Sequence, residues 1–442
     1  MPLDVLQILE RLISIDTVSN VSEGKRPTRE CPDYINSVLN EVGLDAELLE
    51  NDGVYTSLAI HKGKGPKILF LAHFDVVPPG NGWTSAPFTL RIDGDHAYGR
   101  GTCDDKGNVA ALLLLAERAA SSQPECTVMI AATGDEEVGG ARGAAHLRRV
   151  LEERGLTPDY VIVADGIHMQ IIYRRRNILP TLIRAKRRTS PMRGRRETIR
   201  FTTDIFASES RHSAYLRPGV DRHCMLAASK FLGLHPEVVV EAMRGEFVKS
   251  NIIPGWVELD VIWPDDTTSE LEYDTALTQI FRLLLPISRV AFPTRPSDKG
   301  TVICPNLLSL NDDVWTLYCD IRAMTNDSTS VRESIMALLE GWSDLESLEV
   351  HAGAGYVDND PNSSLIIAAR RALKDLRLPV RLREGFGASD SRHFAGTGAS
   401  IFDFGVEGDN LHGPNEWVSI SSIGKTAEFF HHLIQVLSEN HS

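Results

Sequence analysis

The chain contains the stretch Leu69-Phe70-Leu71-Ala72-His73-Phe74-Asp75-Val76-Val77-Pro78, which predicts a buried strand that ends in polar groups. An unbroken apolar run is typical of a strand that is buried on both faces of a parallel sheet. Side chains two positions apart point to the same face, so His73 and Asp75 can meet just beyond the strand. Open α/β sheets bind ligands at this edge, and a carboxylate that orients a histidine is common beside metals. By itself such a pair is more often a core histidine beside an unrelated aspartate, so the rest of the chain decides.

Acidic residues occur at three further places of the same kind. Asp104 and Asp105 lie in the glycine-rich turn 98–107, Glu136 and Glu137 follow the predicted strand 127–133, and Asp165 follows the predicted strand 160–164. A phosphate loop is rejected for the turn, because two acids repel phosphate and the Walker spacing is absent. One acidic loop is usually a solvated surface. Four polar strand ends at equivalent places of one sheet predict a shared metal site instead.

These residue types favour two divalent cations. Histidine and carboxylate ligands without cysteine suit zinc first, with cobalt or manganese as alternatives. Their number exceeds the need of one tetrahedral zinc and fits two ions about 3.5–4 Å apart with a bridging carboxylate. Glu136 is the predicted general base, which takes a proton from water and passes it to the leaving amine. The predicted ligands are Asp104 as the bridge, His73 and Asp165 on one ion, and Glu137 and His412 on the other.

Length and composition bound the remaining possibilities. A chain of 442 residues exceeds what one hydrophobic core usually supports, so two domains are expected. A net charge of −14 argues against nucleic-acid and anionic-membrane binding. No apolar run has the length of a membrane span, and the first residues lack a signal-peptide pattern. Six scattered cysteines indicate reduced thiols, and these features together predict a cytoplasmic protein.

The amino-acid composition of the chain changes after residue 172. Residues 173–200 are strongly basic and contain one acid, Glu197, and we interpret them as a solvated or partly disordered linker. The alternative is a positive surface that steers anionic substrates. Predicted elements then alternate between strands and helices, which indicates a separate α+β domain. They are strands 197–206, 257–262, 315–321 and 348–351 and helices 219–232, 270–285 and 328–339.

After residue 356 the sequence pattern resembles that of the first 172 residues again. Helices are predicted at 362–376 and 422–437, and a strand is predicted at 400–404. One domain is therefore interrupted by another. The predicted boundaries are 1–177 for the first part of the catalytic domain, 178–356 for the inserted domain, and 357–442 for the second part.

Five motifs occur in order along the chain: His73–Pro78, Gly99–Gly107, Asp135–Glu137, Ser389–Arg392 and His412–Glu416. Together they resemble the M-twenty metallopeptidase family. This family includes aminoacylase, acetylornithine deacetylase, succinyl-diaminopimelate desuccinylase, carboxypeptidase G and carnosinase-type dipeptidases. The resemblance implies an α/β fold with a zinc-exopeptidase-like catalytic domain, whose central sheet is mostly parallel, and an inserted α+β lid that also dimerises. It also implies a cis peptide at Asp104–Asp105.

The resemblance implies further site residues. In such lids a histidine from the partner subunit stabilises the oxyanion, and His212 in Ser210-Arg211-His212-Ser213 is the best match; a surface histidine is the alternative. Arg322 and Asn306 resemble lid groups that bind a substrate carboxylate, for which the fork of an arginine is well suited. Gly387 and Ser389 are further candidates for substrate binding, and Asp75 is counted with the catalytic residues.

We therefore expect a cytoplasmic, homodimeric two-metal amide hydrolase whose substrate is a small N-acyl amino acid or a dipeptide with a free carboxylate. Asp165 stands where many deacylases of the family carry glutamate, which favours a dipeptidase slightly. Nucleic-acid and membrane partners are not expected. The alternative from another class is a non-catalytic metal-binding or oligomerisation protein that retains the fold. A third hypothesis is a polyanion binder that uses residues 174–200.

Overall fold

A computed structural model describes residues 2–20, 23–205, 211–266, 269–385 and 387–439. The chain forms two compact units. Unit 1 comprises Met1–Arg175 and Val357–Ser442, and unit 2 comprises Arg176–Tyr356. The inserted unit thus begins two residues before the predicted boundary at 178. Each unit has its own hydrophobic core, and each is described by itself.

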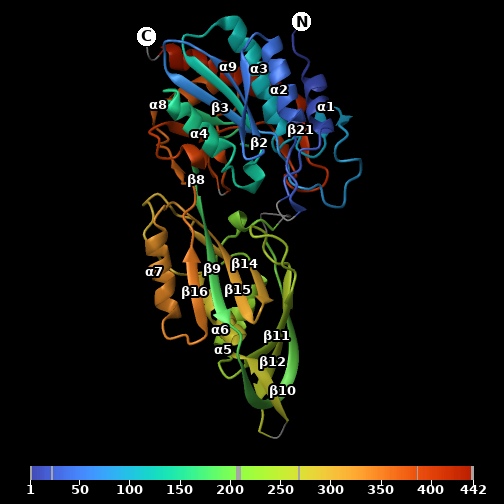
Figure 1. Cartoon of the computed structure of the whole chain (residues 1–442), viewed down its shortest axis with the longest axis vertical. Helices are drawn as coiled ribbons and strands as arrows, with labels where there is room; N and C mark the ends of the chain where they lie inside the picture. Colours follow the sequence, from blue (N-terminus) through green and yellow to red (C-terminus); the bar gives the residue numbers. More distant parts are fainter. Residues whose placement is uncertain (1, 21–22, 206–210, 267–268, 386, 440–442) are drawn as a thin grey trace. The chain divides into compact units, whose positions relative to one another are not determined.

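Unit 1 is built around a sheet of nine strands (Figure 1). The strands follow the order β1-β2-β6-β3-β7-β19-β8-β17, and β18 pairs with β8. The four central strands β6, β3, β7 and β19 are parallel. Strands β1, β2 and β17 pair antiparallel with their neighbours, and β8 pairs antiparallel with β19 and β17 but parallel with β18. The fold is therefore mixed α/β with a parallel centre. The strands are β1 (Ala46–Asn51), β2 (Val54–His61), β3 (Lys67–His73), β6 (Thr127–Thr133), β7 (Tyr160–Val163), β8 (Ile171–Arg175), β17 (Val357–Asp358), β18 (Leu382–Gly385) and β19 (Ser400–Asp403).

The register of the parallel strands brings their carboxyl ends to one edge. His73 at the end of β3 pairs with Thr133 at the end of β6. Leu71 of β3 pairs with Val163, the last residue of β7. Residues that follow these three strands therefore leave the sheet at the same level, where ligand sites of open α/β sheets lie.

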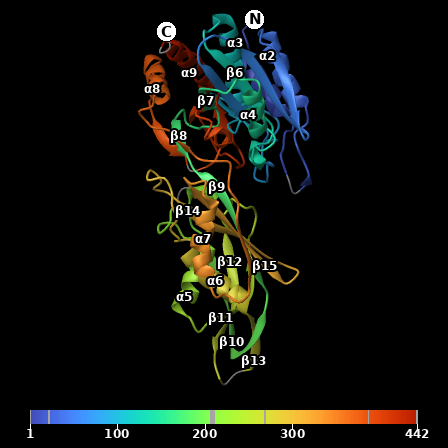
Figure 2. The same ribbon diagram turned by 60° about the vertical axis from the view of Figure 1, so that its left-hand side comes forward.

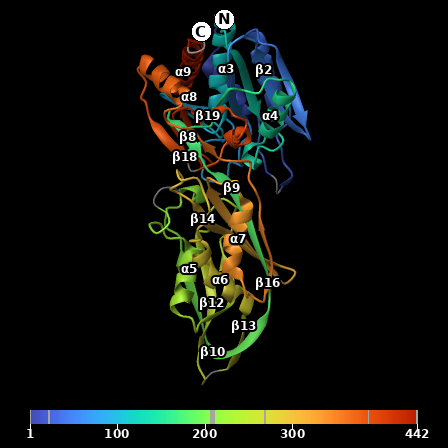
Figure 3. The same cartoon turned by 90° about the vertical axis from the view of Figure 1, so that its left-hand side faces the viewer.

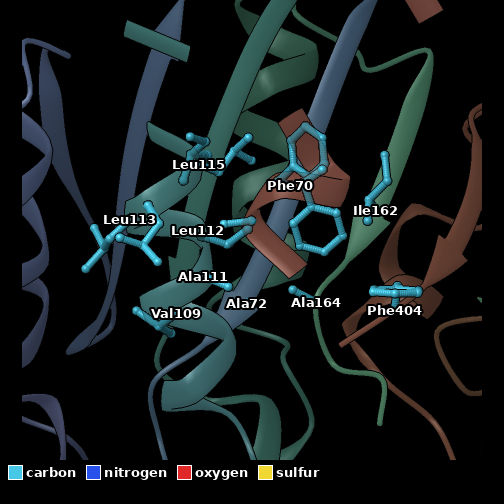
Figure 4. Close-up of a cluster of buried hydrophobic side chains, with 14 of the residues drawn as sticks. Phe70, Ala72, Val109, Ala111, Leu112, Leu113, Leu115, Ile162, Ala164 and Phe404 are labelled. Carbon is cyan, nitrogen blue, oxygen red and sulfur yellow. The ribbon is translucent and has the colours of Figure 1, made fainter. Parts of the chain in front are cut away.

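Helices cover both faces of this sheet (Figure 2). Alternate residues of β3 point to opposite faces. Phe70 packs with α3 and α9 in the larger core, whereas Leu69 and Leu71 pack with α4 on the other side. Figure 4 shows Phe70 in one cluster with Leu112 and Leu115 of α3 and with Ile162 of β7. The helices of unit 1 are α1 (Val5–Ser14), α2 (Glu30–Glu41), α3 (Lys106–Ser122), α4 (Ala144–Glu153), α8 (Ser364–Asp375) and α9 (Ile420–Glu439).

A second, small sheet of unit 1 has the order β20-β21-β5-β4. It joins a segment near residue 97 to a segment near residue 418, because β21 pairs with β5. The loop between β20 and β21 carries His412, and the turn after β5 carries Asp104. The strands are β4 (Arg91–Asp93), β5 (His96–Tyr98), β20 (Gly408–Asp409) and β21 (Trp417–Ser419).

Unit 2 consists of two four-stranded sheets, β14-β15-β9-β16 and β11-β12-β10-β13, with three helices packed against them (Figure 3). Apolar residues from both sheets and all three helices share one core. The elements are β9 (Asn177–Lys186), β10 (Thr189–Thr202), α5 (Cys224–Leu234), β11 (Val239–Gly245), β12 (Trp256–Pro264), β13 (Glu270–Asp274), α6 (Thr275–Ile287), β14 (Val302–Asn311), β15 (Val314–Ala323), α7 (Ser328–Leu339) and β16 (Leu345–Val350).

The interpretation of residues 173–200 as a solvated or disordered linker is wrong. These residues complete β8 and form β9 and most of β10. Their arginines are paired with acids that lie far away in the sequence, so the local excess of positive charge is balanced in the folded chain. The pairs include Arg174 with Asp358 and Glu384, Arg175 with Asp403, Arg176 with Asp298, Arg184 with Glu349, Arg188 with Asp344, Arg196 with Glu241, and Arg200 with Glu258.

The helix predicted at 270–285 begins later than predicted. Residues 270–274 form β13, and α6 starts at Thr275. The Asp274 side chain accepts the backbone N–H of Leu277 and so caps the helix, which is why the element changes type at this residue.

Two further sequence-based expectations concern cysteines and membrane spans. All six cysteines are buried free thiols. Among the helices in the described ranges, none combines the length and the apolar character that crossing a membrane requires.

Candidate metal centre

Asp104 lies between two histidines that are more than 300 residues apart in the sequence. Its Oδ1 is 3.0 Å from Nε2 of His73, and its Oδ2 is 3.1 Å from Nε2 of His412. The same nitrogen of His412 is 3.1 Å from Oε1 of Glu137. Each oxygen of one carboxylate thus faces a different histidine, which is the arrangement a bridging ligand needs.

Two groups of three potential ligands share Asp104. One contains His73, Asp104 and Asp165, and the other contains Asp104, Glu137 and His412; within each group one ligand atom per residue lies within 4.8 Å of the others. The donors are imidazole nitrogens and carboxylate oxygens, which suit zinc, cobalt or manganese. The five residues predicted as ligands from the sequence are therefore brought together, and their donor set fits two divalent cations.

Asp75 connects His73 to the loop that carries Glu136 and Glu137. Nδ1 of His73 is 3.0 Å from the backbone oxygen of Asp75 and 3.4 Å from its Oδ1. The Asp75 carboxylate also accepts the backbone N–H of Glu136 at 3.0 Å and that of Glu137 at 3.2 Å. Ser19 donates its hydroxyl to the same carboxylate at 2.8 Å. Asp75 therefore orients a histidine and also fixes the turn after β6.

Charge interactions at the site oppose the effect of burial. Burial disfavours the charged form of His73, but Asp104 and Asp105 raise its pKa well above the ordinary value. Burial likewise disfavours charge on His412, but Glu137 and Asp104 raise its pKa. Asp104 is also desolvated, yet the two histidines lower its pKa. Burial raises the pKa of Asp165 well above its usual value; the charges of Glu136 and Asp104 act in the same direction, whereas Arg175 opposes them.

Glu136 stands apart from the ligand groups and beside an arginine. Its Oε1 is 3.7 Å from Nη2 of Arg392. Burial raises the pKa of Glu136 to about 7, although Arg392 acts in the opposite direction. The side chain of Glu136 is 13% exposed, so it is shielded from bulk water yet accessible. A carboxyl with these properties can take up and release a proton near neutral pH.

The glycine-rich turn that carries Asp104 has the expected cis peptide at Asp104–Asp105. Gly101 has a φ of +88°, and a Cβ there would lie 2.7 Å from Cγ1 of Val76, so only glycine fits. Oδ2 of Asp105 accepts the backbone N–H of His73 at 3.0 Å. The second acid of the turn therefore fixes the strand end rather than joining either ligand group.

Comparison with known proteins identifies the family. The sequence profile of peptidase family M20/M25/M40 matches residues 69–436. The chain belongs to this peptidase family. It is therefore a metal-dependent hydrolase of amide bonds, as the sequence motifs predicted.

Relatives of this M20/M25/M40 peptidase span its full length. The succinyl-diaminopimelate desuccinylase of Nautilia profundicola is 24% identical over 438 residues, which cover 98% of this chain and 99% of the relative. The aminoacylhistidine dipeptidase of Vibrio alginolyticus has the same fold, with a TM-score of 0.67 and 15% identity over 98% of this chain and 96% of that one. A dinuclear metal-binding peptidase of Bacillus subtilis gives a TM-score of 0.55 and 14% identity over 98% and 97%.

Three predicted residues of this M20/M25/M40 peptidase lie within unit 2. Nδ1 of His212 accepts the backbone N–H of Ala214 at 3.1 Å, and its Nε2 lies 3.2 Å from Nδ2 of Asn251. Asn306 is fully buried and donates to the backbone oxygen of Ser250 at 2.6 Å. His212 and Asn306 therefore contact neighbouring positions of one segment, residues 250–251.

Arg322 belongs to the same neighbourhood of unit 2. Its Nε donates to Oδ2 of Asp320 at 3.0 Å, and Ser213, next to His212, bonds to the same oxygen. The backbone N–H of Ser213 donates to the backbone oxygen of Asn251 at 2.9 Å. The side chain of Arg322 is 4% exposed. The three lid candidates thus belong to one hydrogen-bonded region of unit 2.

Ser389, a candidate for substrate binding, lies in a buried network of hydrogen bonds. Its side chain is fully buried, and its hydroxyl donates to Oδ2 of Asp403 at 2.6 Å. Arg175 donates from Nε to the same oxygen at 2.6 Å and from Nη2 to the backbone oxygen of Asp165 at 2.7 Å. Arg175 also donates to the backbone oxygen of Gly387 at 3.3 Å. Ser389 is therefore linked to a ligand candidate through Asp403 and Arg175.

Several residues that support the site had no assigned role in the sequence analysis. Glu416 belongs to a quoted motif, and its buried carboxylate contacts the Asp104 turn. Nζ of Lys106 is buried and donates to the backbone oxygens of Leu12 and Ile15 at 2.8 Å. Burial lowers the pKa of Lys106 to about 8. Ser19 and the backbone near Leu12 precede the matched family region, and no sequence signal distinguishes them.

Proposed function

We propose that this protein is a two-metal hydrolase that cleaves the amide bond of a small N-acyl amino acid or dipeptide with a free carboxylate. The observation that carries the proposal is Asp104, whose two oxygens face His73 and His412 at 3.0 and 3.1 Å. The proposed ligands are His73 and Asp165 for one ion and Glu137 and His412 for the other, with Asp104 shared. Zinc is the proposed metal, with cobalt or manganese as alternatives.

Two divalent cations at such a site polarise a carbonyl and lower the pKa of a water. The residues of the chain then supply orientation and proton transfer. Glu136 takes the proton of the attacking water and delivers it to the leaving nitrogen, so one carboxyl serves both steps of the reaction. Asp75 holds the turn of Glu136 through its backbone N–H, which keeps this carboxyl beside the ligand groups. Arg392 lies close enough to stabilise the carboxylate form of Glu136 before the proton is transferred.

The proposal extends to the inserted unit and to assembly. Residues 178–356 are proposed as a lid that also forms a homodimer, and His212 is proposed to stabilise the oxyanion in the site of the partner subunit. Arg322 and Asn306 are proposed to recognise the free carboxylate, with Gly387 as a further substrate contact. Ser389 is also proposed as a substrate contact, and it is linked to the backbone of Asp165 through Asp403 and Arg175. The proposed compartment is the cytoplasm.

Two observations favour different substrates within this class. The full-length relative from Nautilia profundicola is named a succinyl-diaminopimelate desuccinylase, which favours an N-acyl amino acid. Asp165 occupies a position where deacylases of the family often carry glutamate, which favours a dipeptide. Both substrate types have an amide bond and a carboxylate, so the same residues serve either reaction.

A hydrolysis screen tests the proposal. Metal-free protein is loaded with zinc or cobalt and given succinyl-diaminopimelate, acetyl-ornithine, N-acetyl-methionine and a set of dipeptides. We expect cleavage of at least one carboxylate-bearing substrate and little cleavage of its C-terminal amide derivative. Protein that holds two ions per chain but hydrolyses none of them supports the rival hypothesis of a non-catalytic metal-binding or oligomerisation protein. The polyanion hypothesis is disfavoured, because most arginines of residues 174–200 are paired with acids.

A further inference from the structure

Glu416 is a fully buried acid whose carboxylate is occupied entirely by the turn that carries Asp104. Its Oε1 accepts the backbone N–H groups of Cys103 at 2.8 Å and Asp104 at 2.9 Å. Its Oε2 accepts the backbone N–H of Gly101 at 2.9 Å and Nη1 of Arg100 at 2.6 Å. Four donors from residues 100–104 therefore meet one carboxylate.

Burying this charged carboxylate costs free energy, which the hydrogen bonds to the turn must offset. Glu416 is 0% exposed and Arg100 is 1% exposed, and the cost of moving two charges out of water must be offset by their attraction and by further hydrogen bonds. Charge-assisted hydrogen bonds to backbone N–H groups are among the strongest that a protein makes. The cost is offset only while residues 100–104 keep this conformation. The carboxylate therefore selects one conformation of the turn.

The same segment also carries a ligand candidate. Glu416 is four residues after His412, whose Nε2 is 3.1 Å from Oδ2 of Asp104. The backbone oxygen of Glu416 accepts the N–H of Gly99 at 3.1 Å, which adds a fifth link between the two segments. One residue thus joins the segment of His412 to the backbone of Asp104.

We propose that Glu416 is a positioning residue that holds Asp104 and His412 in ligand geometry before any cation binds. This inference rests on the proposed two-metal site. It assigns to Glu416 no contact with substrate or metal: its effect passes through the backbone N–H groups of the turn. Groups that orient metal ligands from behind change metal affinity about 10- to 100-fold when they are replaced.

A merely structural role is the alternative, and unit 2 offers a matched control. Asp298 is another buried carboxylate with several donors: Nε of Arg176 at 3.0 Å and the backbone N–H groups of Gly300 at 3.2 Å and Met324 at 2.6 Å. None of its donors belongs to a ligand group. Replacing either acid by its amide substitutes an NH2 group for one acceptor oxygen, so both variants lose comparable contacts.

The test compares zinc binding by metal-free wild type, Glu416→Gln and Asp298→Asn, measured by calorimetric titration. Circular dichroism shows whether each variant is folded. We expect zinc affinity to fall about 10- to 100-fold in Glu416→Gln and to remain at the wild-type value in Asp298→Asn. Wild-type zinc affinity in a folded Glu416→Gln protein overturns the proposal. An equal loss of affinity in both variants overturns it as well, because the effect is then a general one.

Amide hydrogen exchange of the wild-type protein tests the inference without a variant and decides it if Glu416→Gln does not fold. We expect the amides of Gly101, Cys103 and Asp104 to be protected in metal-free protein and little changed by zinc. Rapid exchange that slows only after zinc addition shows that the cation orders the turn, and this overturns the proposal. A protein that binds no zinc at all refutes the proposed function, whereas exchange in the metal-free protein still reports on Glu416.

Discussion

Asp75 accepts the backbone N–H of Glu136 at 3.0 Å while its backbone oxygen lies 3.0 Å from Nδ1 of His73. One residue thus joins the end of β3 to the turn after β6. Its second oxygen accepts the N–H of Glu137 at 3.2 Å and the hydroxyl of Ser19 at 2.8 Å. The residue is completely buried, so every one of these contacts replaces a contact with water. The proposed base and one proposed ligand therefore depend on the same carboxylate.

We predict that Asp75→Asn weakens both activity and metal binding, by about 10- to 100-fold each. The NH2 group of the asparagine is a hydrogen-bond donor at a position where the carboxylate accepts backbone N–H groups. Two donors then face each other, so the turn that carries Glu136 and Glu137 moves. The measurement is zinc content after dialysis together with turnover on the substrate found in the hydrolysis screen. Asp93→Asn is the control, because Asp93 is exposed on the short strand β4. Normal metal content in Asp75→Asn contradicts this account.

Replacing the proposed base separates chemistry from metal binding. We predict that Glu136→Gln keeps the metal content of the wild type and loses about 10²- to 10⁴-fold in kcat, since an amide cannot accept the proton. Glu152→Gln on α4 is the matched control, because its side chain is 40% exposed and lies outside the ligand groups. Metal analysis and steady-state kinetics on the same preparations give both quantities. Activity near the wild-type value rules out Glu136 as the base.

The role proposed for His212 predicts a different kinetic pattern. A group that stabilises the developing oxyanion acts mainly in the transition state, so His212→Ala is expected to lower kcat by about 10²- to 10³-fold with little change in KM. His351→Ala is the control, because this histidine of unit 2 is 56% exposed. The assignment fails if the change lies in KM alone. Mixing inactive Glu136→Gln with His212→Ala protein adds a further check, since recovered activity indicates that the histidine acts on the partner subunit.

Much of the fold could be predicted because its signals are local. The strand at 127–133 and the helix at 328–339 were predicted with the bounds that the structure has, because a continuous apolar run and an amphipathic pattern define them. Within residues 173–200, β9 and the first part of β10 were missed, and only the end of β10 falls in the strand predicted at 197–206. The acids that neutralise Arg174 lie 184 and 210 residues away in the sequence. The residues next to Arg174 therefore give no sign that its charge is paired.

In the candidate site, too, local sequence patterns could be recognised, whereas contacts between distant residues could not. Each proposed ligand follows an apolar strand or belongs to a distinctive motif, so its residue type and place are visible in the sequence. The residues that hold the proposed ligands in place through hydrogen bonds cannot be recognised in this way. Ser19 acts through one hydrogen bond to a distant carboxylate, and no periodic pattern marks it. Lys106 belongs to a quoted motif, but its two contacts with the backbone oxygens of Leu12 and Ile15 cannot be predicted from the sequence. Glu416 could be noticed as part of a motif, but only the coordinates reveal which N–H groups it accepts.

The stability of the protein should fall in mild acid because of His223. This histidine is buried, and its Nδ1 accepts the backbone N–H of Met225 at 3.2 Å at the start of α5. Burial lowers the pKa of His223 to about 4, below its ordinary value of 6.5. Between these two values the unfolded chain binds a proton that the folded chain does not. The contribution to stability is therefore complete above about pH 6.5 and is lost as the pH falls toward 4.

From this shift we expect a loss of about 2 kcal/mol between pH 7 and pH 5 from His223 alone. His223→Asn keeps an acceptor that can cap the helix but cannot be protonated, so its stability should change less over this range. Urea unfolding at both pH values measures the difference, with His351→Asn as the exposed control. If wild type and His223→Asn lose the same stability between pH 7 and pH 5, His223 is not the group that responds to acid.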